Sequence, residues 1–242
     1  MQSPRVYLVL DSCFAIKRWV KPRQWMQVGR DIGFTCMQAS TDNEIDPLFS
    51  DEGYMRDWAE AVRRAQAETG IRLTNFYTGY QTYRTVGLAH HDERNRRRLV
   101  DRWLKPMVDM ASKLDAGLGF YLFAYTEEVL RNPQKYAETT DLILDQLREV
   151  AGYAGARGAV EISIEQMYSP HQPPWTIDGT LEFLRRANAP SQHPVYITID
   201  VGHQTGQHRF RKPNRAELEA VARRATSGES VADVWLGADP VY

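Results

Sequence analysis

Two runs of alternating apolar and polar residues each end on an acidic side chain. The run ISIE ends on Glu165, and the run VYITID ends on Asp200. Neighbouring parallel strands lie about 5 Å apart, so carboxylates at their equivalent ends would repel each other unless they share a proton or a cation. The pair therefore predicts a site for Mn²⁺, Mg²⁺ or Co²⁺, and nearby imidazoles widen the choice to Zn²⁺. The alternative is that each carboxylate caps a helix or pairs with an arginine.

Basic and imidazole side chains follow both runs. His208 and Arg209 lie in the segment after Asp200, and His171 lies in a proline-rich stretch after Glu165. A positive loop at a site entrance suits a substrate carboxylate or phosphate. We therefore predict His171, His208 and Arg209 as substrate-binding residues. The alternative for the last two is a solvated basic loop.

Short β-branched or aromatic runs alternate with amphipathic patterns, and these elements must position the acidic residues. The expected strands are Val6–Leu10, Phe34–Ala39, Arg72–Tyr77, Leu118–Ala124, Val160–Glu165 and Val195–Asp200. The expected helices are Met55–Thr69, Asp92–Leu114 with a kink at Pro106, Glu138–Ala154, and one that Thr176 caps and that runs through Asn188. This alternation predicts an α/β fold with a parallel sheet.

The pattern within the expected strands favours a closed barrel over an open sheet. Strands of an open parallel sheet are usually apolar on both faces. Here one face is apolar and the other becomes more charged toward the carboxyl end, as in a barrel whose upper layer faces an active site. The polar or aromatic residues expected to face the interior are Asn75, Tyr77, Tyr121, Phe123 and Tyr125.

Composition excludes several classes of function. The 242 residues include 30 basic and 31 acidic side chains, a balance that gives no footprint for nucleic acid or an anionic membrane. We find neither a membrane-spanning apolar run nor a signal peptide. The two cysteines, Cys13 and Cys36, indicate reduced thiols. We expect one cytoplasmic domain over residues 1–242, with no nucleic-acid or membrane partner.

The segments ISIEQMYSP (162–170) and TIDVGH (198–203) resemble the fifth- and sixth-strand signatures of the xylose isomerase-like barrels. LAHHDERNRRR (88–98) also resembles the third strand–helix junction of that superfamily. It includes sugar isomerases, ketose 3-epimerases, inosose dehydratases and the endonuclease IV branch of DNA repair. The resemblance implies that Glu165 and Asp200 bind a metal ion and that His203 contacts substrate oxygens nearby.

The sequence departs from that superfamily at its carboxyl end. A histidine on strand seven and a carboxylate on strand eight normally complete the metal site, and eight units would need about 300 residues. Val234–Gly237 could form a short strand seven that carries Asp239 to the site. Otherwise we expect a barrel that lacks its last one or two strand–helix units. Homo-oligomerisation, a domain swap or a partner chain would then cover the exposed strand edge.

The function expected from these residues is a metal-dependent isomerase or epimerase of a small sugar, keto-sugar or sugar acid. A metal ion that holds two adjacent oxygens of a hydroxyketone stabilises the enediolate, and Glu165 would be the base. A decarboxylase or lyase of an oxidised sugar acid would form the same enediolate, so it is an alternative. A third possibility is an incomplete barrel that acts as a non-catalytic binding subunit. Near-neutral charge disfavours the DNA-repair branch.

Overall fold

The computed structural model describes residues 6–43, 45–78, 85–189, 193–206, 215–216, 219 and 223. Within these residues six parallel strands form one sheet in the order β1-β2-β3-β4-β5-β6. The strands are β1 Leu10–Asp11, β2 Cys36–Ser40, β3 Arg72–Thr78, β4 Gly117–Phe120, β5 Ile162–Gln166 and β6 Val195–Ile199. Because each strand pairs with the next one along the chain, the connections wind in one direction, as in a TIM-type barrel.

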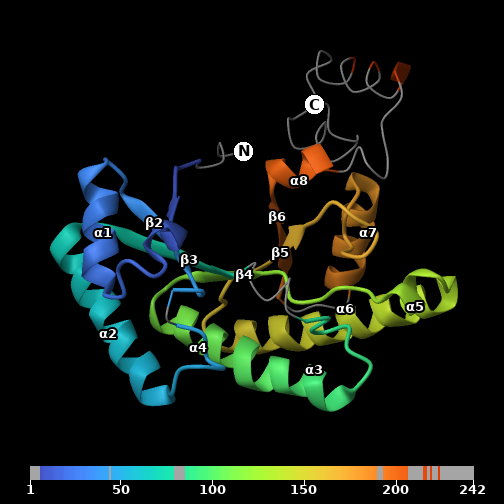
Figure 1. Ribbon diagram of the computed structural model, residues 1–242, viewed down its shortest axis with the longest axis horizontal. Coiled ribbons are helices and arrows are strands. Elements are labelled where there is room, and N and C mark those ends of the chain that lie inside the picture. Colours follow the sequence, from blue (N-terminus) through green and yellow to red (C-terminus); the bar gives the residue numbers. More distant parts are fainter. Residues whose placement is uncertain are drawn as a thin grey trace.

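Helices connect these strands. They are η1 Ser12–Ala15, α1 Pro22–Asp31, α2 Glu52–Thr69, α3 Glu93–Leu99, the π-helical turn η3 Val100–Leu104, α4 Lys105–Lys113, α5 Glu127–Leu130, α6 Pro133–Ala156, α7 Ile177–Asn188 and α8 Val201–Gly206. Figure 1 shows α1 and α2 on the side of β2, and α7 on the side of β6. The described part of the chain contains no helix that is both long and apolar enough to cross a bilayer.

The helix signals in the sequence mark most helix ends correctly. Thr176 caps α7, since its hydroxyl accepts a hydrogen bond from the Gly179 amide at 3.1 Å. Gly70 ends α2 in the left-handed conformation, with φ of 73°. The helix expected over Asp92–Leu114 is divided by η3, and Pro106 lies just after this turn. The π turn accommodates a residue that has no amide hydrogen to donate.

All six strands differ from their expected bounds, four of them by only one or two residues at an end, and β1 and β4 by more. Strand β1 starts only at Leu10, because its partner β2 begins at Cys36 and the register pairs Leu10 with Met37. Strand β4 ends at Phe120, and Phe123 then forms an isolated antiparallel bridge with Gly87. The Phe123 ring stacks on Phe183 of α7, with 6.4 Å between ring centroids.

Tyr125, the next aromatic residue expected inside the barrel, packs on α6 instead. Its ring meets Tyr136 edge-on at 4.7 Å, and its hydroxyl lies 2.7 Å from that of Thr140. The placement of Phe123 and Tyr125 in the interior was therefore wrong. Alternation of residue types holds only while the chain remains in the sheet.

The sheet has one apolar and one polar face, as the strand pattern predicts. Leu118, Phe120, Ile162 and Ile164 are fully buried, and the helical layer contributes Trp103, Leu104, Met107 and Leu147 to the same core. On the inner face, Gln38 donates to Asp11 at 2.5 Å and accepts from Asn75 at 2.7 Å. The inner face thus offers hydrogen-bonding groups rather than a second apolar core.

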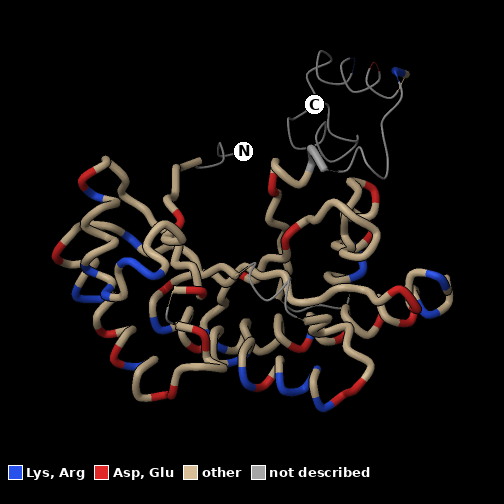
Figure 2. Tube along the Cα trace, viewed as in Figure 1, with Lys and Arg blue, Asp and Glu red and all other residues tan. Residues whose placement is uncertain are grey.

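The sheet is open between its first and last strands. Among the described residues, β1 pairs only with β2 and β6 pairs only with β5. Tyr196 on β6 and Val201 just beyond it are 47% and 70% exposed. This agrees with the expected partial barrel. Lys and Arg alternate with Asp and Glu over the outer helices (Figure 2), in keeping with the net charge of −1.

Candidate metal centre

Strands β5 and β6 bring Glu165 and Asp200 to the same edge of the sheet. Glu165 lies within β5 and pairs in register with Thr198, two residues before Asp200. Asp200 ends the strand segment and caps α8, because its Oδ1 accepts from the Gly202 amide at 2.7 Å. The first turn of α8 then brings His203 back toward β5. The Asp-Val-Gly-His spacing therefore places two side chains on one site.

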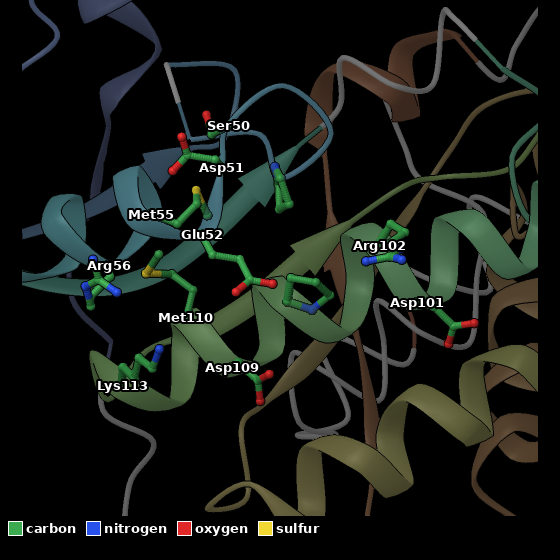
Figure 3. A pocket seen from close by; sticks show the side chains of 12 residues that line it. Ser50, Asp51, Glu52, Met55, Arg56, Asp101, Arg102, Asp109, Met110 and Lys113 are labelled. Carbon is green, nitrogen blue, oxygen red and sulfur yellow. The ribbon is translucent and has the colours of Figure 1, made fainter.

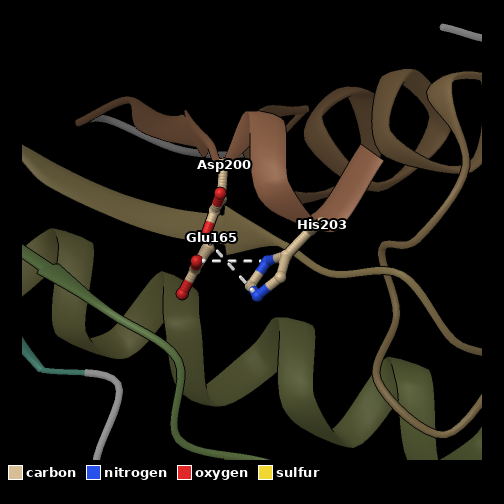
Figure 4. A group of neighbouring side chains, drawn as sticks. All are labelled: Glu165, Asp200 and His203. Carbon is tan, nitrogen blue, oxygen red and sulfur yellow. Dashed lines mark ion pairs between the residues drawn. The ribbon is translucent and has the colours of Figure 1, made fainter. Parts of the chain in front are cut away.

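The three side chains converge, as Figure 4 shows. His203 Nδ1 lies 3.2 Å from Glu165 Oε1, and His203 Nε2 lies 3.5 Å from Asp200 Oδ2. One possible ligand atom from each residue lies within 4.8 Å of the other two. His203 Nδ1 also lies 3.1 Å from the Gln166 carbonyl oxygen, and its ring lies 5.2 Å from that of Tyr168.

Among the described side chains, the carboxyl groups of Glu165 and Asp200 have the His203 imidazole as their one basic neighbour. Glu165 is only 7% exposed. Burial, and next the nearby Asp200, raise the pKa of Glu165 to about 8. Within the described ranges, neither residue forms an ion pair with a lysine or an arginine. The arginine alternative therefore finds no support there, whereas Asp200 does cap a helix.

This donor set fits a divalent cation. Carboxylate oxygens are the ligands of Mg²⁺ and Mn²⁺, and an imidazole nitrogen extends the choice to Co²⁺ and Zn²⁺. A positive charge between the two carboxylates would also oppose the burial and the repulsion from Asp200 that raise the pKa of Glu165. The cluster thus has the ligand types of a metal site and, among the described residues, no lysine or arginine that would neutralise them.

A contact that the sequence did not reveal holds the buried carboxylate. The Tyr77 hydroxyl, from β3, donates a hydrogen bond to Glu165 Oε2. The sequence pattern predicts correctly that Tyr77 faces the interior, but not that it reaches β5. The sequence did contain one signal for this contact. Gly117 and Gly119 leave β4, which lies between β3 and β5, without side chains on this face.

Of the other predicted substrate-binding residues, His171 lies in the described part of the chain, and it is not part of this cluster. His171 is exposed in the loop after β5, and its Nδ1 lies 3.3 Å from the Tyr125 carbonyl oxygen. Its contact with substrate stays a prediction. His208 and Arg209 lie outside the described residues, as do Val234–Gly237 and Asp239.

A groove elsewhere in the structure holds none of the predicted site residues. It has a volume of about 640 Å³ and lies between α2 and the η3–α4 segment. Figure 3 shows Met55 and Met110 beside charged groups such as Glu52, Arg102 and Asp109. Because these residues belong to the outer helical layer, the groove is not the entrance to the metal centre.

Comparisons with known proteins agree with this architecture. A family model described as xylose isomerase-like TIM barrel matches residues 26–234. No curated protein sequence matches the chain.

Among solved structures, a provisionally assigned xylose isomerase from Rhodospirillum rubrum matches with a TM-score of 0.74 and 22% identity, over 81% of this chain and 66% of that one. The 3-keto-D-glucoside 4-epimerase YcjR from E. coli matches with a TM-score of 0.59 and 14% identity, over 90% of this chain and 75% of that one.

A third match is a xylose isomerase-like TIM barrel protein from Mycobacterium smegmatis in complex with magnesium. The TM-score is 0.54 and the identity 17%, over 83% of this chain and 62% of that one. At these identities the matches show the shared fold. The chain spans slightly less than two thirds of the R. rubrum protein and of the M. smegmatis protein.

Proposed function

Because the chain belongs to the xylose isomerase-like TIM barrel family, we propose that it is a divalent-metal-dependent isomerase or epimerase of a small sugar, keto-sugar or sugar acid. The convergence of Glu165, Asp200 and His203 at the carboxyl ends of β5 and β6 carries the proposal. That edge of the sheet is where barrel enzymes hold their reacting groups. The epimerase and the magnesium complex among the matched structures support the reaction class and the metal.

Glu165, Asp200 and His203 would hold the cation. When bound, a divalent cation polarises the adjacent oxygens of a hydroxyketone and stabilises the enediolate that forms between them. Glu165 takes the proton from the carbon beside the carbonyl, and the electron pair of that C–H bond becomes the enediolate double bond. Return of the proton from Glu165 to the neighbouring carbon gives an isomer. An epimer requires a second acid that delivers a proton to the opposite face of the same carbon.

The polar inner face suits a polyhydroxylated substrate. Gln38 and Asn75 offer amide groups, and Ser163 and Thr198 offer hydroxyls that lie 3.0 Å apart on neighbouring strands. Groups that both donate and accept match sugar hydroxyls, which do the same. Burial of Glu165 keeps bulk water from the carbon that loses its proton.

The first experiment is elemental mass spectrometry on wild type, Glu165→Gln and Asp200→Asn, with Glu138→Gln as the matched control. Glu138 is an exposed glutamate on α6, far along the chain from the three ligands. We expect about one divalent ion per chain in wild type and in the control, and loss of the ion in both site variants. Turnover of ketoses and keto-sugars is then measured with chelator and with added Mn²⁺ or Co²⁺.

The outcomes separate the alternatives. Turnover that chelator abolishes and metal restores supports the proposal. Metal binding without turnover of any ketose or keto-sugar favours the binding-subunit alternative. A wild-type chain that stays metal-free in excess Mn²⁺ contradicts the proposal, because the three ligands would then not suffice.

A further inference from the structure

We propose that Tyr77 is a positioning residue that fixes the Glu165 carboxylate, and that Gly119 provides the space through which the tyrosine ring reaches it. The inference rests on the proposed function, because it assigns the fixed carboxylate to a metal ligand and base. It concerns residues on β3 and β4, which supply none of the three proposed ligands.

The contact spans three strands. Tyr77 on β3 pairs in register with Gly119 on β4, and Gly119 pairs with Ser163 on β5. Glu165 lies two residues beyond Ser163, on the same face of the sheet. The Tyr77 side chain therefore crosses β4 to donate its hydroxyl hydrogen to Glu165 Oε2.

Gly119 is required by space rather than by backbone conformation. A Cβ at this position would lie 2.8 Å from Cδ2 of the Tyr77 ring and 2.8 Å from Ser163 Oγ. Both distances are shorter than a carbon atom tolerates, so any larger residue displaces the ring or the serine. Since no positive φ is present at Gly119, the close approach of the Tyr77 ring and of Ser163 Oγ is the physical reason for glycine.

The hydrogen bond gives the two carboxylate oxygens different partners. Tyr77 occupies Oε2, whereas Oε1 faces His203 Nδ1 at 3.2 Å. Hydrogen bonds behind a ligating group fix its orientation, and their loss typically lowers metal affinity by about 10- to 100-fold. Tyr77 thus leaves Oε1 turned toward Asp200 and His203 before any cation arrives.

The alternative is that the Tyr77 ring only fills space in the barrel. The two roles predict different results for Tyr77→Phe, which keeps the ring and removes the hydroxyl. A space-filling role predicts unchanged Mn²⁺ affinity. A positioning role predicts weaker Mn²⁺ binding.

The experiment is Mn²⁺ titration calorimetry on wild type, Tyr77→Phe, Gly119→Ala and the double variant. Gly152→Ala is the matched control, since Gly152 is an exposed glycine of α6 and a Cβ there meets nothing within 4 Å. We expect Tyr77→Phe to weaken Mn²⁺ binding by about 10-fold or more. Gly119→Ala should weaken it to a similar extent, and the double variant should lose no more than the larger single loss, because both changes break one contact.

Each outcome bears on a separate claim. Wild-type affinity in Tyr77→Phe would overturn the role of the hydroxyl and leave the proposed metal site intact. Additive losses in the double variant would show that Gly119 acts independently of Tyr77, which overturns the account of the glycine. A wild-type chain that binds no Mn²⁺ would overturn the proposed function and this inference together.

Discussion

Two clusters of charged side chains in this protein have opposite electrostatic balance. On the outer helices, Arg97 and Lys105 contact Asp101 and Glu149, with Arg97 bidentate to Glu149 at 2.6 and 2.9 Å. At the sheet edge, the carboxylates of Glu165 and Asp200 share a single imidazole. The outer cluster pairs two cations with two anions, whereas the inner cluster offers two carboxyl groups one imidazole.

The difference appears in the two glutamates. Hydrogen bonds from Arg97 and then Lys105 lower the pKa of Glu149 to about 2. Burial and the nearby Asp200 raise the pKa of Glu165 to about 8. A fold can satisfy a carboxylate with its own cations where the group only stabilises helix packing. A buried carboxyl group without a lysine or arginine partner reduces stability when it ionises, and is expected where a bound ligand supplies the missing charge.

The largest expected effect is on Mn²⁺ affinity, which should fall in a variant of the inner cluster and stay unchanged in a variant of the outer cluster. Asp200→Asn should lower Mn²⁺ affinity by more than about 100-fold, because a ligand is lost rather than a group behind one. Asp101→Asn changes an aspartate of the outer cluster and should leave Mn²⁺ affinity unchanged. Calorimetric titration of both variants tests this. Equal losses in the two variants would erase the distinction between the clusters.

A smaller effect concerns stability without metal. In chelator at pH 8, Glu165→Gln should raise the free energy of unfolding, on the order of 1 to 3 kcal/mol. In the unfolded chain Glu165 loses its proton above pH 4.5, its usual pKa. In the folded chain its pKa is raised to about 8, so it keeps the proton up to that pH. Wild-type stability therefore falls across this window as pH rises, and the variant lacks that loss.

Urea denaturation at pH 5 and pH 8 measures the gap in the free energy of unfolding between wild type and Glu165→Gln. It should widen with increasing pH. A gap that is constant or narrows at high pH would mean that Glu165 is ionised and satisfied within the fold.

In the outer cluster we expect the opposite change in the free energy of unfolding. Glu149→Gln should lower the free energy of unfolding at pH 7 by about 1 kcal/mol, since the side chain is 36% exposed and water screens its ion pairs. The lowered pKa makes this contribution present above the usual value of 4.5 and lost as pH falls toward 2. Urea denaturation at pH 7 and near pH 2 tests both statements. A variant as stable as wild type at pH 7 would contradict them.

The smallest effect tests the geometry of the outer cluster. Arg97→Lys keeps the charge but loses the bidentate contact with Glu149, and should cost about 0.5 kcal/mol. High salt should reduce this difference, because the residues are partly exposed. Thermal denaturation at low and high ionic strength measures it, and a salt-independent difference would indicate a packing effect instead.

The order of elements could be predicted from the sequence with little error. Six apolar runs separated by amphipathic segments gave six parallel strands in chain order, because alternation and caps are local properties. Errors arose where packing overrides the pattern. Phe123 and Tyr125 continue the alternation of β4 but pack against α7 and α6. Helix α1 has a polar composition, and the sequence pattern did not reveal it.

The candidate site also has features that the sequence predicts and features that depend on packing. The sequence by itself determined that Glu165 and Asp200 lie at the carboxyl ends of neighbouring strands, because the alternation and spacing that mark these strands are local properties. The resemblance already implied that His203 lies near them. Only the tertiary structure decided that its imidazole contacts both carboxylates, that no described lysine or arginine pairs with Glu165, and that Tyr77 reaches Glu165 across Gly119. Such contacts depend on the register and spacing of three strands, and these are fixed only when the sheet assembles.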